Sequence, residues 1–389
     1  MANISDYIDW RGDVSFNASP FNRIDALILC QITYLNFTGL LPDSDFSVSL
    51  TLKELADKFK ALKDYKKRAD VGVLINKNTA SFFLKAAESV RFRDVKITGF
   101  CSKIDLSIEE QFAAATYLLP DSTCYICYRG TDDSIVGWKE DFNLAIEEEV
   151  PAQKDAVEYL EKAGENISGK IRIGGHSKGG NLAIYASAYC SKKVRDRILK
   201  IYNNDGPGFY EERIHSEEFK AIEERINSYY PQFSIVGMLF YHSGIQNFVE
   251  SDEQGVMQHD PFSWHLKGVD FVRLPKNDYA SRFFHQTFNA WIVKLSPTER
   301  EVFVDTVFGI LESTDARTNS EIEANLAKNS VKIIKAINKL DPEMKKMCEK
   351  TIREFFLAGH SQLKKFDLKI LGKIKEKGKK LLAKSEFGK

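Results

Sequence analysis

The sequence has no long apolar run. Nowhere in its 389 residues do about eighteen apolar residues follow one another, which is the length that a membrane-spanning helix needs. The first residues, MANISDYIDWRGD, place charged side chains where a secretory signal peptide requires an uninterrupted apolar stretch. We therefore expect a soluble, cytoplasmic protein.

The sequence also has no excess of charge of either sign. Lys and Arg together number 55, as do Asp and Glu. Since binding to nucleic acid depends largely on basic charge, this balance gives the chain as a whole no reason to bind nucleic acid. Hydrophobic residues make up 43% of the chain, which is ordinary for a globular protein and sufficient for a sizeable core.

Cysteines are few and follow no spacing typical of secreted disulfide domains, so we take them as reduced thiols. The six are Cys30, Cys101, Cys124, Cys127, Cys190 and Cys348. The pair at 124 and 127 stands in the apolar run TCYICYR, which predicts a buried strand. Residues three apart on a strand face opposite sides of the sheet, so the two sulfurs could not share a metal ion. We predict no metal site.

Strand and helix signals alternate in the middle of the chain. The first hundred residues have helical character, with a capping box at Thr51 to Glu54, and KITGFCSKIDL and QFAAATYLLP then predict strands. The expected elements that follow are a strand over 123–129, helices over 138–148 and 151–163, a strand over 170–174, a helix over 178–191, a strand over 198–204, a helix near 216–227 and a strand over 246–249. This order predicts an α/β fold, a mostly parallel sheet covered by helices.

Strand signals stop beyond about residue 280. Helix signals continue, among them a capping box with proline at the first helical position, Ser296-Pro-Thr-Glu299. We therefore divide the chain into a domain of residues 1–280 with a helical lead-in and a C-terminal helical region of residues 281–389. The last stretch, residues 363–389, spaces apolar residues helically between many lysines. It fits peripheral contact with an anionic membrane surface, but we favour a lysine-coated helix that packs on the domain or frays at the terminus.

The strongest chemical signal is Gly175-His176-Ser177-Lys178-Gly179, between a predicted strand and a predicted helix. A serine nucleophile needs such a sharp, strained turn to present its hydroxyl at the end of the strand, and the glycines leave room for the crossing backbones. The helix that begins there aims N–H groups at developing negative charge. The alternative is a glycine-rich turn without chemistry.

A second segment makes the pattern specific. Tyr128-Arg-Gly-Thr131, then Gly137-Trp138 and Asp141, then the serine turn resemble the F-R-G-[ST], W-x-x-D and G-H-S-L-G-G segments of the class 3 (fungal-type) lipases, over roughly residues 120 to 265. The surrounding IDWRGDVSFNASPFNRIDALILCQITYLNF and QHDPFSW resemble a bacterial lipase-like family of unknown function. The resemblance implies an α/β-hydrolase fold, no metal or organic cofactor, and a small-molecule or lipid ester as substrate.

The same resemblance implies an oxyanion hole formed by the N–H groups of Thr131 and Lys178, with the Thr131 hydroxyl as a further donor. A plain strand-ending turn at Gly130 to Asp132 is the alternative. Trp138 and Asp141 match the lipase segment, but we assign neither a catalytic role, because a tryptophan that anchors a helix explains the match equally well.

The general base is best assigned to His259. Enzymes of this type carry the histidine on a loop after a late strand, and His259 stands in a polar loop after the strand expected over 246–249. His176 adjoins the nucleophile, His215 lies in a charged helical stretch, and His285 and His360 fall in the tail. The other candidates are His242 and His265, and His259 itself is open to the interpretation of an ordinary loop histidine.

The acid is harder to place, because the segment that carries it in class 3 lipases has Ser234 here. Asp205 ends the strand expected over 198–204, at the edge where catalytic residues gather, although it could equally be a turn aspartate. Asp252 is a lesser candidate, and Asp260 is too close in sequence to orient its neighbour's ring.

The predicted function is a serine hydrolase acting on a carboxylic ester through an acyl-enzyme. The alternative is a catalytically silent α/β-hydrolase used as a binding or membrane-surface protein.

Overall fold

The computed structural model describes residues 1–72, 75–144, 147–234, 236–275, 296–318, 321, 325–342 and 344–345. Within these ranges the main sheet has nine strands. In their order across the sheet they are β1 (Ser49–Thr51), β2 (Lys96–Asp105), β3 (Glu110–Leu118), β4 (Cys124–Tyr128), β5 (Ile171–His176), β6 (Ile198–Asn204), β7 (Ile226–Pro231), β8 (Ile245–Val249) and β11 (Arg273–Leu274). Strands β4 to β8 are parallel to one another, and the outer neighbours pair antiparallel. The expected α/β fold is confirmed.

Helices lie between and around these strands. The described α-helices are α1 (Ile4–Arg11), α2 (Arg23–Ile32), α3 (Leu52–Lys60), α4 (Tyr65–Ala69), α5 (Thr79–Glu88), α6 (Ile135–Asn143), α7 (Pro151–Asn166), α8 (Lys178–Tyr189), α9 (Lys192–Arg195), α10 (Glu211–Ile214), α11 (Glu217–Lys220), α13 (Pro297–Glu312) and α15 (Leu326–Lys339). The 3₁₀ turns are η1 (Glu223–Arg225), η2 (Val236–Met238), η3 (Gly255–His259) and η4 (Pro261–Ser263). A two-stranded ribbon joins β9 (Leu266–Lys267) and β10 (Asp270–Phe271).

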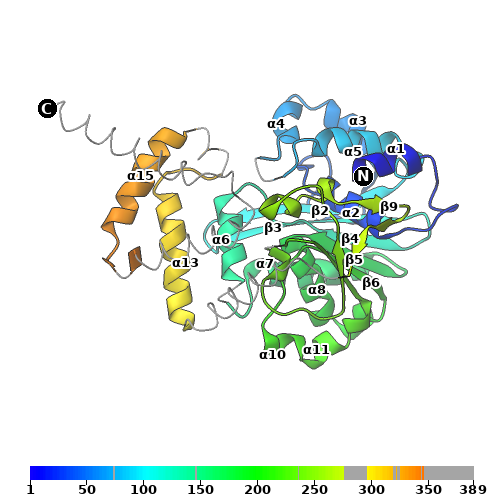
Figure 1. Ribbon diagram of the computed structural model, residues 1–389. Helices are drawn as coiled ribbons and strands as arrows, with labels where there is room; N and C mark the ends of the chain where they lie inside the picture. The colour runs from blue at the N-terminus through cyan, green and yellow to red at the C-terminus, as the bar shows by residue number, and fades with distance from the viewer. Residues whose placement is uncertain are drawn as a thin grey trace.

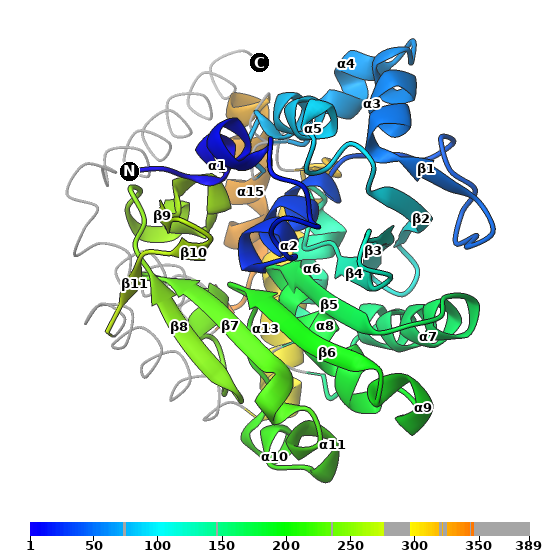
Figure 2. The ribbon, with the colours of Figure 1, turned by 90° about the vertical axis from the view of Figure 1, so that its right-hand side faces the viewer.

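The order of the parallel strands explains why the chain begins with helices. Strands β4 to β8 are added in one direction, and right-handed crossovers then place their connecting helices on a single face of the sheet. Helices α7, α8 and α11 cover that face, and the N-terminal helices α1, α2, α3 and α5 cover the other (Figure 1). Figure 2 shows β5 to β8 side by side between these layers. The helical lead-in therefore supplies the half of the core that the crossovers leave open.

Alternation along β4 divides its side chains between the two cores. Tyr125 and Cys127 belong to the core beneath the N-terminal helices, whereas Cys124, Ile126 and Tyr128 belong to the core beneath α7 and α8. Cys124 and Cys127 thus face opposite sides of the sheet, as predicted. The five cysteines among the described residues are buried free thiols.

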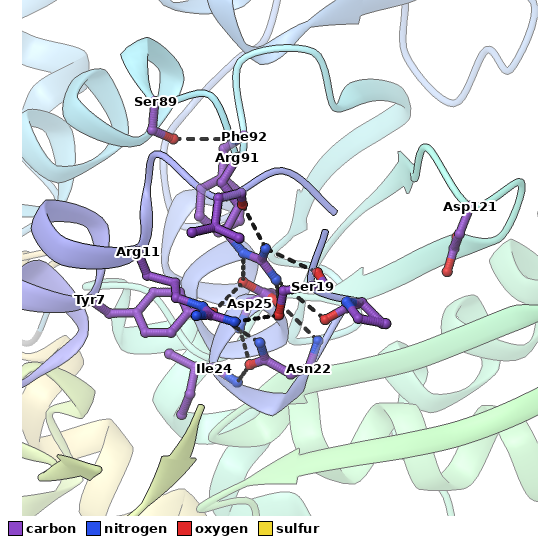
Figure 3. Close-up of polar contacts among 12 residues, drawn as sticks. Tyr7, Arg11, Ser19, Asn22, Ile24, Asp25, Ser89, Arg91, Phe92 and Asp121 are labelled. Carbon is purple, nitrogen blue, oxygen red and sulfur yellow. Dashed lines mark hydrogen bonds and ion pairs between the residues drawn. The ribbon is translucent and has the colours of Figure 1, made fainter. Parts of the chain in front are cut away.

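A buried ion pair joins α2 to the loop between α5 and β2. Arg91 donates from Nε and Nη2 to the two carboxylate oxygens of Asp25, at 2.7 and 2.6 Å, and both side chains are fully buried (Figure 3). Its Nη1 donates to the carbonyl oxygens of Val14 and Ser19, and Tyr7 donates to Asp25 Oδ1. One guanidinium therefore holds α2 and the loop before it in place.

The prediction of a helix near 216–227 is wrong in the second half of that range. Only the short helix α11 and the turn η1 form there, and Ile226 begins β7, a strand that the sequence did not predict. The run EEFKAIEERI has helical spacing, but β7 pairs with β6 on one side and β8 on the other. Sheet pairing and burial override local helix propensity at this point.

Helix α13 of the C-terminal region packs against α6 (Figure 1). The rings of Phe142 and Phe308 lie 5.5 Å apart, and Lys139 Nζ lies 2.9 Å from Asp305 Oδ1. The capping box at Ser296 and Glu299 forms as predicted. The predicted boundary at residue 281 and the lysine-rich stretch 363–389 lie outside the described residues.

Two classes of structure are not found in the described part of the chain. None of its helices has the length and apolarity needed to cross a membrane. Likewise, no group of three or more His, Cys, Asp and Glu side chains within it is arranged to hold a metal ion.

Candidate active site

Ser177 lies on a strained turn between β5 and α8. Its φ and ψ angles are 58° and −135°, in a region that a residue with a side chain rarely adopts. The two flanking glycines are required by space: a Cβ on Gly175 would lie 2.2 Å from the carbonyl carbon of Gly179, and one on Gly179 would lie 2.1 Å from the oxygen of Tyr128. The local sequence therefore produces the geometry of a nucleophile elbow.

Asp205 and His259 are brought together from positions 54 residues apart. His259 Nδ1 lies 2.6 Å from Asp205 Oδ2. Asp205 directly follows β6 and its side chain is buried, whereas His259 ends η3 and a quarter of its side chain is exposed. Because a carboxylate only accepts, Nδ1 carries the proton and the outer nitrogen, Nε2, is free to act as a base.

Ser234 makes a hydrogen bond to Asp205. Its hydroxyl donates to Asp205 Oδ1 at 2.5 Å, and the N–H of Gly237 donates to the same hydroxyl at 2.8 Å. Ser234 follows β7, the strand next to the one that Asp205 follows. The serine at the position where class 3 lipases carry their acid thus contacts an acid that comes from the neighbouring strand.

The other candidates for base and acid are engaged elsewhere. His265 Nε2 lies 2.6 Å from Asp252 Oδ1, and His242 Nδ1 lies 2.8 Å from the hydroxyl of Tyr230. The carboxylate of Asp260 accepts from the side chain of Asn76 and from the main chain. His215 ends α10, and His285 and His360 lie outside the described residues. Asp205 and His259 are therefore the pair that the fold assembles next to the serine turn.

Thr131 follows β4 at the same edge of the sheet as Ser177. A Cβ on the neighbouring Gly130 would lie 2.9 Å from the Cβ of Ser177, so the two turns are in contact. Within the described residues, neither the main-chain N–H of Thr131 nor that of Lys178 donates a hydrogen bond. Two unpaired donors beside a nucleophile are the arrangement that an oxyanion hole requires.

The Thr131 hydroxyl is already committed to Asp141. It donates to Asp141 Oδ2 at 2.6 Å, which leaves the main-chain N–H as the donor that Thr131 can offer to a ligand. The other carboxylate oxygen of Asp141 is buried without a hydrogen-bond partner among the described residues. Burial raises the pKa of Asp141 to about 6, against the opposing effects of Lys178 and Thr131. The sequence pattern includes Asp141, but it does not predict the hydrogen bond between Asp141 and Thr131.

The side chain of Lys178 makes contacts that the sequence did not suggest. Its fully buried ammonium group lies 2.5 Å from Glu140 Oε2 and donates to the carbonyl oxygen of Gln111 at 2.7 Å. Glu140 also accepts from the main-chain N–H groups of Gln111 and Ala152. One carboxylate therefore joins β3, α6 and α7 to the first residue of the helix that follows the nucleophile.

Replacing Asp141 by asparagine is expected to make the free energy of unfolding less dependent on pH between about pH 4 and pH 6. The folded pKa of about 6 exceeds the ordinary 3.8, so the folded chain binds the additional proton and the stability of the wild type falls as pH rises through this interval. The shift corresponds to about 3 kcal/mol. Asparagine has no proton to lose in this range and keeps an acceptor for Thr131. Urea unfolding of both proteins at several pH values measures the difference, and equal pH slopes would contradict the assignment.

The central sheet of parallel strands and the helices on its two faces form an α/β-hydrolase-type fold, which brings the serine turn and the Asp205–His259 pair together. The chain belongs to the Mbeg1-like family, whose model matches residues 86–309, more than half of the chain. This confirms the predicted family resemblance, and the match includes Thr131, Ser177, Lys178, Asp205 and His259. A crystal structure of M37 lipase is similar with a TM-score of 0.34 and 14% identity, over 57% of this chain and 70% of that chain. No curated protein matches the chain.

Proposed function

We propose that this protein is a serine hydrolase that cleaves a carboxylic ester through an acyl-enzyme. The observation that carries the proposal is the hydrogen-bonded pair of Asp205 and His259, at 2.6 Å, beside a serine held in a strained elbow. A buried carboxylate that orients a histidine, which in turn serves a serine, is the constellation that activates a hydroxyl for acyl transfer.

In the first half of the reaction, His259 Nε2 takes the proton of Ser177 as its oxygen bonds to the ester carbonyl carbon. The N–H groups of Thr131 and Lys178 hold the resulting oxyanion, and the buried Asp205 stabilises the imidazolium. His259 then gives the proton to the leaving alkoxide, and the carbon–oxygen bond to the alcohol breaks. Water repeats these steps on the acyl-enzyme and releases the acid. The fold does not define the substrate, and an ester with an apolar acyl chain is proposed on family resemblance.

The competing function, a catalytically silent binding or membrane-surface protein, drew its main support from the missing acid. Asp205 is the acid that we propose: it follows β6, its carboxylate contacts His259, and Ser234, which follows β7, donates to it. This contact favours the enzyme over the silent alternative.

Labelling with a fluorophosphonate tests the proposed function. The wild type is expected to form a covalent adduct at Ser177, located by peptide mass spectrometry, and Ser177→Ala is expected to form none. The matched control is Ser187→Ala, which changes another buried serine of the same segment, on α8, and should label normally. Absence of labelling in folded wild type across probes of several sizes would contradict the enzyme and favour the binding protein.

A further inference from the structure

His176, the residue before the nucleophile, is buried between two other elements of the site. Its Nδ1 lies 2.9 Å from the hydroxyl of Tyr34, and its Nε2 lies 2.9 Å from the carbonyl oxygen of His259. The ring centroids of His176 and His259 are 4.5 Å apart, with 35° between their planes. One side chain thus contacts both the main chain and the ring of the proposed base.

These contacts fix the tautomer of His176. A carbonyl oxygen only accepts, so Nε2 must carry the hydrogen that it donates to His259. Burial lowers the pKa of His176 well below its ordinary value, and the ring is therefore neutral. In a neutral imidazole the other nitrogen accepts, so the Tyr34 hydroxyl donates to Nδ1. The hydrogen bonds run in one direction, from Tyr34 through His176 to the main chain of His259.

The position of His259 makes such support necessary. It ends the 3₁₀ turn η3, outside the sheet and the α-helices, so no regular ladder of hydrogen bonds fixes its backbone. Asp205 orients one end of the ring only. A displacement of about 1 Å between a base and a nucleophile can lower the rate by about 100-fold. The backbone of His259 therefore needs a second anchor, and His176, covalently joined to Ser177, lies where that anchor is required.

We propose that His176 is a positioning residue: held by Tyr34, it fixes the main chain and the ring of His259 relative to Ser177. This inference rests on the proposed function, since it assigns His176 a role in that same site. Because His176 remains neutral, the imidazolium that forms on His259 during the reaction meets no second positive charge from its neighbour. Tyr34 also lies beside the turn of Thr131, since a Cβ on Gly130 would lie 2.3 Å from its hydroxyl.

Two substitutions of His176 distinguish positioning from simple packing. The amide nitrogen of glutamine can take the place of Nε2 and donate to His259, whereas that of asparagine is too short to reach. We expect His176→Asn to lower kcat by about 100-fold with KM within about twofold, and His176→Gln to recover most of the loss. Equal losses in both variants, or a folded His176→Asn with wild-type kcat, would overturn the proposal.

A readout independent of turnover separates this proposal from the proposed function. The proton between His259 Nδ1 and Asp205 should give a far-downfield resonance in the NMR spectrum, assigned by its absence in His259→Ala. We expect the resonance in the wild type and in His176→Gln, and its loss in His176→Asn. If the wild type neither labels nor hydrolyses an ester, the resonance alone decides whether His176 positions His259, and its persistence in His176→Asn overturns the positioning role.

Tyr34→Phe gives a milder test in case His176→Asn does not fold. It removes one hydroxyl and leaves the ring in place, so Nδ1 of His176 loses its donor. We expect kcat to fall by about tenfold, which corresponds to the loss of a hydrogen bond of about 1.4 kcal/mol. Wild-type kcat in Tyr34→Phe would exclude Tyr34 from the hydrogen-bond chain.

Discussion

His259→Ala is expected to lower kcat on a p-nitrophenyl ester by about 10⁶-fold, close to the loss expected for Ser177→Ala. Without the imidazole, nothing at the site takes the proton of the serine hydroxyl, and the nucleophile stays inactive. The two residues act as a unit, so the double variant should lose little more than either single variant. Steady-state rates of the three variants and of the wild type test this non-additivity.

The control for this prediction is His265→Ala. His265 lies on the same segment but pairs with Asp252 and Glu250, and its removal should leave kcat within a few-fold of wild type. A folded His259→Ala that keeps its turnover would remove His259 from the mechanism and return the assignment of the base to His242 or His265.

Asp205→Asn is expected to lose about 10⁴-fold in kcat, because the amide fills the same space but cannot stabilise the imidazolium and favours the wrong tautomer. The backbone tolerates this substitution: Asp205 has a φ of 54°, a conformation in which asparagine is also common. Asp252→Asn is the matched control and should be nearly neutral. Near-normal turnover in a folded Asp205→Asn would eliminate Asp205 as the acid.

The parts of the site that follow from local constraints could be predicted from the sequence. The turn at Ser177 is one, because Gly175 and Gly179 are needed wherever a strand and a helix cross so closely. Asp205 is another: it ends a strand of the parallel sheet, and residues at that edge converge regardless of their separation in the chain. The division of Cys124 and Cys127 between two faces follows from the period of a strand alone.

The supporting contacts could not be predicted, because each depends on tertiary structure. Asp141 reaches Thr131 only once α6 has packed against β3, the strand that pairs with β4, and Ser234 reaches Asp205 only because β7 lies next to β6. Since β7 was not predicted, and a helix was expected to run into its first residues, its neighbours could not be placed. The sequence shows only that His176 adjoins the nucleophile, and only the fold reveals that its Nε2 meets the main chain of His259.

Arg91→Met is expected to lower the free energy of unfolding by about 3 to 5 kcal/mol, because it breaks the buried ion pair with Asp25. The substitution leaves the carboxylate of Asp25 buried without its cation. Burial already raises the pKa of Asp25, and Arg91 opposes that rise. Without Arg91 the folded chain holds the proton more tightly, so the loss of stability should be larger at neutral pH than at acid pH. Urea unfolding at two pH values measures both effects.

A matched control separates the effect of losing a buried ion pair from the effect of losing any ion pair. Lys85 on α5 and Asp9 on α1 form another ion pair, with Nζ 2.6 Å from Oδ2. Their side chains are 40% and 60% exposed. Lys85→Met should therefore cost less than about 1 kcal/mol. In Arg91→Met, Val14 and Ser19 also lose the donor of their carbonyl oxygens, so adding Asp25→Leu should restore only part of the stability. A loss in Arg91→Met no larger than in Lys85→Met would show that the buried Arg91–Asp25 pair stabilises the fold no more than an exposed ion pair does.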